Sequence, residues 1–320
     1  MKAAVLHAFG EAPRYEEFAE PVAQENEEVL EVKAASLKNI DRGLARGAHY
    51  DSHSQLPTIV GVDGLAVMSG GTRVYCGAPH APYGMMAERV PIGKRYRFPV
   101  PDGVDDATAA ALPNAAMSGW LALSERAELL AGETVLVMGA TGVSGKLAVR
   151  IAKHLGAGRV VAAGRNVKVL EQLWDHGADA ILPLQEEPER MSRAFLAEKG
   201  DGYDVVLDYI WGAPMEVLLH ALTGHDLEGA PYRTRIVQVG DMAGRSIQLA
   251  AGTLRSSAIE LMGSGGGSVS PSAMAAVIPK IFALAEQGIL TIDTEVLPLS
   301  DVQAAWDRPL QSGRRIVFVP

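Results

Sequence analysis

The sequence predicts an α/β protein in which a doubly wound parallel-sheet domain is inserted in a discontinuous β-rich domain. The main observation is a regular alternation of strand-like and helix-like segments from Thr134 to Met262, which is typical of a parallel sheet covered by helices on both faces. A second observation is that glycine and proline interrupt the first third of the chain at short intervals, as expected for short strands joined by tight turns. A third is that strand-like segments return near the C-terminus.

The inserted domain is expected to contain six strands, enough for a complete doubly wound nucleotide-binding fold. We expect these strands at 135–138, 159–163, 181–184, 205–209, 236–239 and 259–262, and helices at 143–155, 168–176, 188–198 and 214–222. The segments 105–112 and 117–126 are expected to be helical, and no long helix is expected before residue 104.

The β-rich domain is expected to draw on both ends of the chain. Strands are expected at 2–9, 28–33, 291–297 and 316–319, with an apolar-faced helix at 271–287. Because the last strands could rejoin the first, we place the β-rich domain at residues 1–113 plus 257–320. The parallel-sheet domain then comprises residues 114–256.

Composition narrows the classes of function. Hydrophobic residues make up 48% of the 320 residues and charged residues 21%, so a sizeable core is expected. A formal net charge of -9 makes nucleic acid and an anionic membrane poor candidates for partners. The single cysteine, Cys76, excludes an internal disulfide and fits a reducing compartment. We read no secretory signal and no membrane-spanning stretch, so the cytoplasm is the expected location.

The segment from Val135 to Gly145 carries the strongest functional signal. It is an apolar strand that runs directly into a turn of small residues and then into a helix. The N-terminus of a helix offers unpaired N–H groups and a positive dipole end, which suit a pyrophosphate, and small residues let phosphates approach the backbone. The alternative is a plain tight turn without a ligand. The residues expected to bind the nucleotide are Ala140, Thr141, Gly142, Val143, Ser144 and Gly145.

The end of the second strand indicates which nicotinamide cofactor is bound. An NAD site usually has a carboxylate about 20 residues after the glycine turn, where it binds the ribose 2′-hydroxyl. Here the strand ends in Gly164-Arg165-Asn166, with Lys168 close behind and no acidic residue. Two cations suit a 2′-phosphate, although both could be ordinary solvated residues at a helix start. We therefore expect NADPH.

Taken in order along the chain, these motifs resemble the medium-chain dehydrogenase/reductase superfamily, and most of all its zinc-free quinone oxidoreductase branch. The resemblance covers nearly the whole length. The segments that carry it are 2–5, 39–41, 46–50, 57–64, 140–145 and 164–168. It implies a Rossmann domain inserted in a GroES-like barrel domain, with Val239, Gly240, Gly263 and Ser264 lining the nicotinamide. Val143 stands where the superfamily commonly has a glycine, and Trp211 where smaller residues are usual.

The first loop of the β-rich domain indicates how the reaction is catalysed. Zinc-dependent relatives place a cysteine and a histidine near this loop, whereas this chain has Lys38 and Asn39, which supply no soft ligand. His49 and His53 are close in sequence but lack a third partner, so we expect no metal. The resemblance supports Asn39 and Tyr50 as hydrogen-bond donors to the substrate oxygen.

Three neighbouring acidic and basic residues are assigned structural roles. We expect Asp41 and Arg46 to form a structural pair, and Asp63 to organise the turn around Gly61 and Gly64.

These observations favour a zinc-independent, NADPH-dependent oxidoreductase that passes hydride to a small electrophile, a quinone or an α,β-unsaturated carbonyl compound. The alternatives are an enoyl-thioester reductase and an NADPH-binding redox sensor without turnover.

The last strand of the parallel sheet, Ile259 to Met262, would lie at a sheet edge, and an uncovered apolar edge is an aggregation hazard. We therefore expect a homodimer in which two such edges meet.

Overall fold

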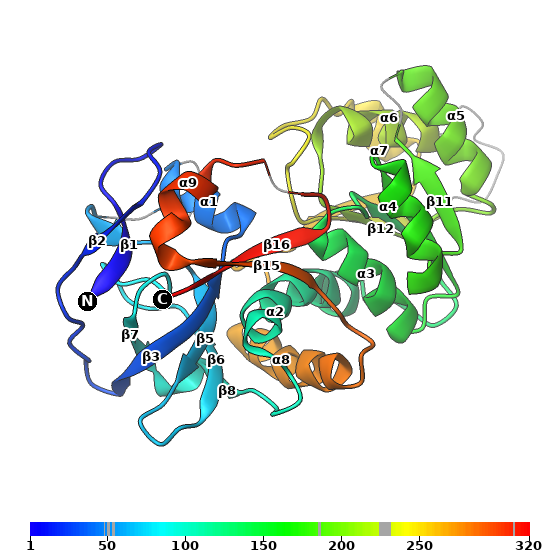
Figure 1. Ribbon diagram of the computed structural model, residues 1–320. Coiled ribbons are helices and arrows are strands. Elements are labelled where there is room, and N and C mark those ends of the chain that lie inside the picture. Colours follow the sequence, from blue (N-terminus) through cyan, green and yellow to red (C-terminus); the bar gives the residue numbers. More distant parts are fainter. Residues whose placement is uncertain (48, 50–51, 53–54, 185–186, 224–231, 310) are drawn as a thin grey trace. The chain divides into compact units, whose positions relative to one another are not determined.

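The computed structural model describes residues 1–320 apart from 48, 50–51, 53–54, 185–186, 224–231 and 310. The chain divides into two compact units by its internal contacts. One unit combines Met1–Asn114 with Ile278–Pro320, and the other is the continuous segment Ala115–Val277. Both chain ends belong to the discontinuous unit (Figure 1).

The continuous unit is built on one parallel sheet. Its strands are β9 (Thr134–Met138), β10 (Arg159–Gly164), β11 (Ala180–Pro183), β12 (Val205–Asp208), β13 (Thr234–Gln238) and β14 (Ile259–Gly263). They lie in the order β11-β10-β9-β12-β13-β14, with every pairing parallel. The chain leaves β9 toward β10 and β11 and later returns to β12 on the other side. This change of direction beside β9 is where doubly wound sheets bind their ligands.

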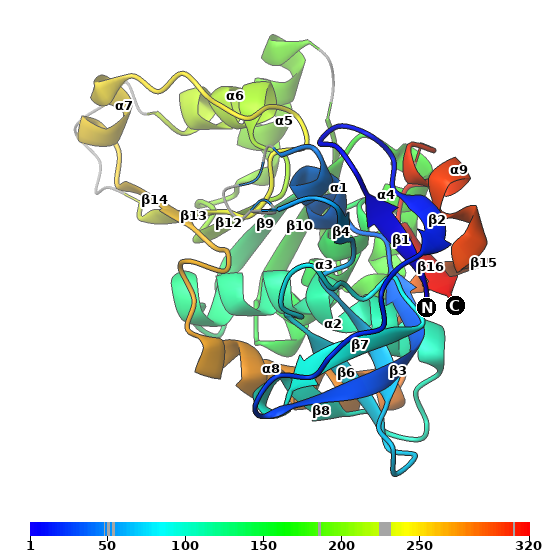
Figure 2. The ribbon, with the colours of Figure 1, turned by 90° about the vertical axis from the view of Figure 1, so that its left-hand side faces the viewer.

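Helices cover both faces of this sheet. They are α3 (Val143–His154), α4 (Val167–Gln172), η3 (Leu173–His176), α5 (Pro188–Glu198), α6 (Gly212–Leu222) and the short α7 (Ala251–Arg255). Figure 2 shows α3 on one face, with α5 and α6 on the opposite face. Val135, Leu136, Val137 and Met138 of β9 are all fully buried, as expected for a central strand with helices on both sides.

The discontinuous unit contains two sheets. The smaller one is antiparallel and has the order β2 (Arg14–Glu17), β1 (Lys2–Leu6), β4 (Thr58–Ile59). The larger one has the order β15 (Asp293–Pro298), β16 (Arg314–Val319), β3 (Glu27–Ser36), β5 (Asp63–Val67), β6 (Arg73–Gly77), β8 (Arg97–Pro99), and β7 (Arg89–Gly93) also pairs with β3. The C-terminal strand β16 therefore lies directly beside β3, antiparallel to it.

Short helices complete the discontinuous unit. They are α1 (Asn39–Ala45), η1 (Lys94–Tyr96), η4 (Leu299–Asp301) and α9 (Val302–Trp306). Two longer helices, α2 (Asp106–Leu121) and α8 (Pro271–Glu286), each cross the division between the units, and a single-turn π-helix, η2 (Ala122–Arg126), follows α2. None of the described helices has both the length and the apolar character that crossing a bilayer requires.

The fold class expected from the sequence is confirmed. All six strands expected in the parallel sheet are present, with ends displaced by a few residues. The second division between the units falls after Val277, later than the expected residue 256. The reason is that β14 pairs with β13 along its whole length, which keeps Ile259–Gly263 with the parallel sheet.

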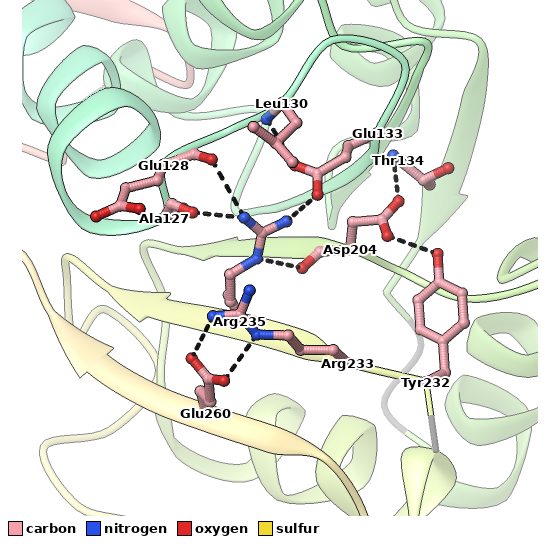
Figure 3. A network of polar contacts seen from close by, with 10 residues as sticks. All are labelled: Ala127, Glu128, Leu130, Glu133, Thr134, Asp204, Tyr232, Arg233, Arg235 and Glu260. Carbon is pink, nitrogen blue, oxygen red and sulfur yellow. Dashed lines mark hydrogen bonds and ion pairs between the residues drawn. The ribbon is translucent and has the colours of Figure 1, made fainter. Parts of the chain in front are cut away.

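A buried arginine ties together the amino ends of three strands of the parallel sheet (Figure 3). Arg235 of β13 is 4% exposed. Its guanidinium group donates to the carbonyl oxygens of Ala127, at 2.6 Å, and Glu128, at 3.3 Å, and it pairs with the Glu133 carboxylate. It also reaches the carbonyl oxygen of Asp204 at 3.4 Å. Arg235 therefore satisfies the backbone of the loop that leads into β9.

The carboxylate of Asp204 extends this network to β9. It accepts the backbone N–H of Thr134 at 2.7 Å and the hydroxyl of Tyr232 at 2.8 Å. On the exposed side of the sheet, Arg233 makes a two-pronged ion pair with Glu260 of β14, at 2.7 and 3.0 Å (Figure 3).

We predict that Arg235→Met lowers the free energy of unfolding by about 3 kcal/mol, because the change removes the cation that pairs with the half-buried Glu133 carboxylate and leaves two carbonyl groups without their donor. Chemical denaturation monitored by circular dichroism measures this loss. Arg233→Met is the matched control: it removes an arginine of the same strand region whose ion pair is exposed, so its effect should be much smaller. Equal losses for the two variants would contradict the structural role of Arg235.

Candidate functional site

The turn after β9 folds back tightly on the neighbouring strand. The backbone N–H groups of Gly139 and Ala140 both donate to the carbonyl oxygen of Ala163 in β10, at 2.9 and 2.8 Å. Gly139 has a φ of 85°, a conformation that glycine adopts at little cost. The N–H of Gly142 then donates back to the Gly139 carbonyl at 3.0 Å. These bonds direct the chain from the end of β9 into α3.

Helix α3 approaches this turn so closely that its third residue must be glycine. A Cβ atom on Gly145 would lie 2.2 Å from the carbonyl oxygen of Gly139. Gly142 is the N-cap residue and, as a glycine, has no side chain with which to cap the helix. A helix start of this kind offers backbone N–H groups to a ligand, which fits a bound pyrophosphate. Val143, which replaces the expected glycine, is only half-buried and leaves the turn intact.

The end of β10 joins the same turn. A Cβ atom on Gly164 would lie 2.6 Å from Cγ2 of Thr141, so these two predicted residues are in direct contact. Arg165, Asn166 and Lys168 follow and are exposed at the start of α4. The Asn166 side chain caps α4 by accepting the N–H of Val169 at 3.3 Å, so its role here is structural.

Arg165 and Lys168 are the two cations at this position. Among the residues that the structure describes, neither makes a hydrogen bond or an ion pair with the protein. Cations at the N-terminus of α4 oppose its dipole, and a 2′-phosphate would offset that repulsion. The arrangement therefore fits a phosphorylated dinucleotide.

The remaining predicted cofactor residues lie at the ends of β13 and β14. The N–H groups of Val239 and Gly240 donate to the carbonyl oxygen of Asp208, at 2.7 and 3.1 Å. The N–H of Ser264, next to Gly263, donates to Gln238 at 2.9 Å. All the predicted cofactor residues thus follow the carboxyl ends of the parallel strands, which is where open α/β sheets bind ligands.

The sequence analysis missed Asp208, a fully buried carboxyl group at the end of β12. It accepts the N–H of Ile210 at 2.9 Å and that of Trp211 at 3.0 Å. Trp211 has a φ of 54°, an unfavourable conformation for a bulky residue, and these hydrogen bonds hold it there. Burial raises the pKa of Asp208 to about 6, although both N–H donors act to lower it. The sequence did contain a signal for this residue: Asp208 is an acidic residue at the end of an otherwise apolar strand.

The predicted catalytic residues belong to the discontinuous unit. Asn39 is the first residue of α1 and is exposed. Tyr50 lies outside the described residues, as does His53. No group of three or more histidine, cysteine or acidic side chains among the described residues could hold a metal ion.

A buried cluster of charged side chains surrounds the start of α1. The ammonium group of Lys38 lies 3.0 Å from Oδ1 of Asp63 and 3.9 Å from Oδ2 of Asp41. It also donates to the carbonyl oxygen of Ser36 at 2.9 Å. The other oxygen of Asp63 accepts the side-chain amide of Asn114 at 2.9 Å. We call Lys38, Asp41, Asp63 and Asn114 the α1 cluster.

Within the α1 cluster, Asp41 takes a role that differs from the expected one. Its carboxylate accepts the backbone N–H groups of Lys38, at 2.8 Å, and Val62, at 3.0 Å. No contact with Arg46 is found among the described residues, because Asp41 is buried whereas Arg46 is exposed. Burial raises the pKa of Asp41, the charge of Lys38 opposes that shift, and the charge of Asp63 adds to it.

Two proteins are similar to this chain over nearly its whole length. No protein-family model matches the chain. The "probable NADPH-dependent quinone reductase" of Emericella nidulans is 26% identical over an alignment that covers 96% of each chain. The crystal structure of the quinone oxidoreductase from Thermus thermophilus, also solved with NADPH, is 27% identical, with a TM-score of 0.75 over the whole length of both chains. The chain is thus similar over its whole length to quinone reductases, in keeping with its resemblance to the medium-chain dehydrogenase/reductase superfamily.

Other proteins are similar over part of the chain or in fold. The chloroplastic NADPH-dependent alkenal/one oxidoreductase of Arabidopsis thaliana is 30% identical over 59% of this chain and 51% of its own length. The structure of a mycobacterial protein complexed with NADPH has a TM-score of 0.83 at 19% identity, which is a likeness of fold.

We predict that the free energy of unfolding falls as the pH rises from about 4 to about 6, in part because of Asp208. Its pKa is about 6 in the folded chain against an ordinary value of 3.8, so the folded chain holds this proton more tightly than the unfolded chain does. The contribution of Asp208 to the free energy of unfolding is complete below the pKa that this group has in the unfolded chain. It is lost as the pH rises through the pKa that the group has in the folded chain. It amounts to about 3 kcal/mol.

The Asp208→Asn variant tests this contribution because an amide oxygen can still accept the two backbone N–H groups and does not titrate. The midpoint of urea unfolding, measured from pH 3.5 to pH 7.5, should vary less in the variant than in the wild type. An identical pH profile for the two proteins would show that Asp208 is not the titrating group.

Proposed function

We propose that the chain is an NADPH-dependent oxidoreductase that transfers hydride to a quinone or an α,β-unsaturated carbonyl compound without a metal ion. The observation that carries this proposal is that two features occur together at the carboxyl ends of neighbouring strands of the parallel sheet. The uncapped first turn of α3 begins at Gly142, and the exposed cations Arg165 and Lys168 follow the adjacent strand. The names of the Emericella and Arabidopsis relatives, which specify NADPH with a quinone and with an alkenal or alkenone, support it.

The continuous unit would hold the cofactor. The first-turn N–H groups of α3 bind the pyrophosphate, and Arg165 and Lys168 bind the 2′-phosphate. The backbone around Val239, Gly240, Gly263 and Ser264 lines the nicotinamide ring. When bound, NADPH supplies a hydride from C4 of that ring. The two glycines and Ser264 leave the backbone free to approach the ring.

The discontinuous unit would stabilise the developing charge. In this proposal Asn39 and Tyr50 donate hydrogen bonds to the substrate oxygen as it becomes negative. A quinone or an enone is already electrophilic, so aligning it with the nicotinamide ring and solvating its oxygen suffice. The final proton can come from water, so no dedicated acid is required.

Independence from zinc is part of the proposal because the first loop lacks suitable ligands. Lys38 and Asn39 occupy the loop position where zinc-dependent relatives have soft ligands. Cys76, the single cysteine, is fully buried beside Met85. Burial raises the pKa of its thiol to about 12, so it is a poor source of thiolate. A free thiol also suits a reducing compartment such as the cytoplasm, which we propose as the location.

We predict that the purified protein, treated with a chelator, oxidises NADPH much faster than NADH when given an ortho-quinone or an α,β-unsaturated ketone. Absorbance at 340 nm follows the reaction. A preference for NADH would overturn the cofactor assignment, and loss of activity on chelation would overturn the metal-free mechanism. Reduction of an enoyl thioester alone would favour a thioester reductase, and tight NADPH binding without turnover would favour a sensor.

The Arg165→Ala variant tests the 2′-phosphate site directly. Its Kd for NADPH should rise by about tenfold, the effect of losing one charge-assisted hydrogen bond. Its Kd for NADH, which lacks the 2′-phosphate, should stay the same. Arg190→Ala is the control because Arg190 is also an exposed arginine at the start of a helix of the same unit, α5. An equal change in the affinity for both cofactors would contradict the assignment.

We further propose that the chain forms a homodimer through the edge strand β14, Ile259–Gly263. The opposite edge of this strand is paired with β13. Ile259 is buried and Leu261 and Met262 are half-buried, whereas Glu260 is exposed and bound by Arg233. An edge of this kind is suited to antiparallel pairing with its own copy about a twofold axis.

We predict a dimer at micromolar concentration by light scattering, and a monomer for Leu261→Pro. The N–H of Ser264 points toward β13, so by the alternation along a strand the N–H of Leu261 points to the outer edge. Proline at 261 would therefore block pairing at the outer edge without removing a bond to β13. A monomeric wild type, or a dimeric variant, would refute the β14 interface.

A further inference from the structure

The α1 cluster joins several segments of the discontinuous unit around one ammonium group. Lys38 precedes Asn39 directly, and its ammonium group donates to the end of β3 at Ser36 and lies between the carboxylates of Asp41 and Asp63. It is also 3.4 Å from the carbonyl oxygen of Asp63. An ammonium group has three donors and no acceptor, so its acceptors fix its position. The end of β3, the start of α1 and the start of β5 are thus held at one point.

The side chain of Asp63 extends this connection to α2. One of its oxygens faces Lys38, and the other accepts the amide of Asn114 in the middle of α2. Asp63 is in turn fixed by close packing, since a Cβ atom on Gly77 would lie 2.9 Å from the Asp63 Cβ. The position of the Lys38 ammonium group is therefore tied to two elements that pack rigidly.

Burying this set of charges is costly. Lys38 is 2% exposed and Asp41 1%, and removing such ions from water costs several kcal/mol each. Apolar residues of similar volume are often as stable as a buried ion pair or more so, so stability alone does not account for the cluster. What the ion pairs add is a defined geometry for the segment 36–41, which includes Asn39.

We propose that Lys38 is a positioning residue for hydride transfer: its buried ammonium group fixes the segment that presents Asn39 to the substrate oxygen. The inference rests on the proposed function and adds a residue to it. Lys38 does not touch the substrate in this role. Replacing it should lower kcat through Asn39, while NADPH, whose proposed site is in the continuous unit, still binds normally.

The experiment uses the double variant Lys38→Met/Asp63→Asn, because Lys38→Met alone would leave the buried Asp63 carboxylate without its cation and could unfold the chain. The asparagine at 63 keeps an oxygen for Asn114. We expect the double variant to have a Tm within a few degrees of the wild type and an unchanged Kd for NADPH. With a quinone acceptor, its kcat should fall by at least tenfold.

A second readout separates positioning from general disturbance. Asn39→Ala should lower kcat in the wild type but should change it little in the double variant, because Asn39 is already misplaced there. The matched control is Arg97→Met/Glu28→Gln, which removes another ion pair of the same unit, 2.6 Å long and with Arg97 largely buried. This control should retain the kcat of the wild type.

The outcomes are distinct. A double variant with wild-type kcat, or an equal effect of Asn39→Ala in both backgrounds, would overturn the role of Lys38 while leaving the proposed function in place. A wild type that oxidises no NADPH with any acceptor would overturn the proposed function and this role with it. If the double variant does not fold, Asn114→Ala, which releases Asp63, replaces it. An unchanged kcat in that variant would also overturn the inference.

Discussion

The contact between α3 and the turn after β9 is the constraint on which the candidate cofactor site depends. A Cβ atom at Gly145 would lie 2.2 Å from the carbonyl oxygen of Gly139, and one at Gly164 would lie 2.6 Å from Cγ2 of Thr141. Helix α3 therefore packs directly on the backbone of the turn, and the end of β10 packs on the side chain of Thr141. Such contacts leave no freedom for the helix to slide along the sheet. The helix N-terminus therefore keeps a fixed place beside the end of β10, and the groups proposed to bind pyrophosphate and 2′-phosphate keep a fixed separation.

The two ends of the parallel sheet divide stability and chemistry between them. At the amino ends of the strands, Arg235 and Asp204 satisfy loop backbone with buried charge. At the carboxyl ends, the uncapped turn of α3 and the strained Trp211 are instead left in arrangements that cost stability. Asp208 shows both effects. Its carboxyl group accepts the backbone N–H of Trp211 and so holds this residue in its strained conformation, and burial at this position raises the pKa of Asp208. Residues that lower stability and have no evident structural role tend to be found at functional sites.

The parallel-sheet unit was predictable because its signals are local. Each strand and helix between Thr134 and Gly263 is a continuous periodic segment, and the glycine turn requires small residues at fixed spacing. The α1 cluster was not predictable in the same way. Lys38, Asp63 and Asn114 are far apart in sequence and meet only when β3, β5 and α2 pack together. Sequence spacing alone suggested Arg46 as the partner of Asp41, but burial, which decides the partner, depends on the tertiary fold.

The pairing of β16 with β3 has a consequence for biosynthesis. Residues 115–277 form a continuous unit, so this unit can complete its sheet as soon as its own residues have left the ribosome. The other unit needs Val317 and Phe318 to pair with the end of β3, and these residues are synthesised only after the whole continuous unit. The usual order, in which N-terminal domains fold first, is therefore reversed. The strands that precede the continuous unit must wait, with an incomplete sheet, until β16 emerges.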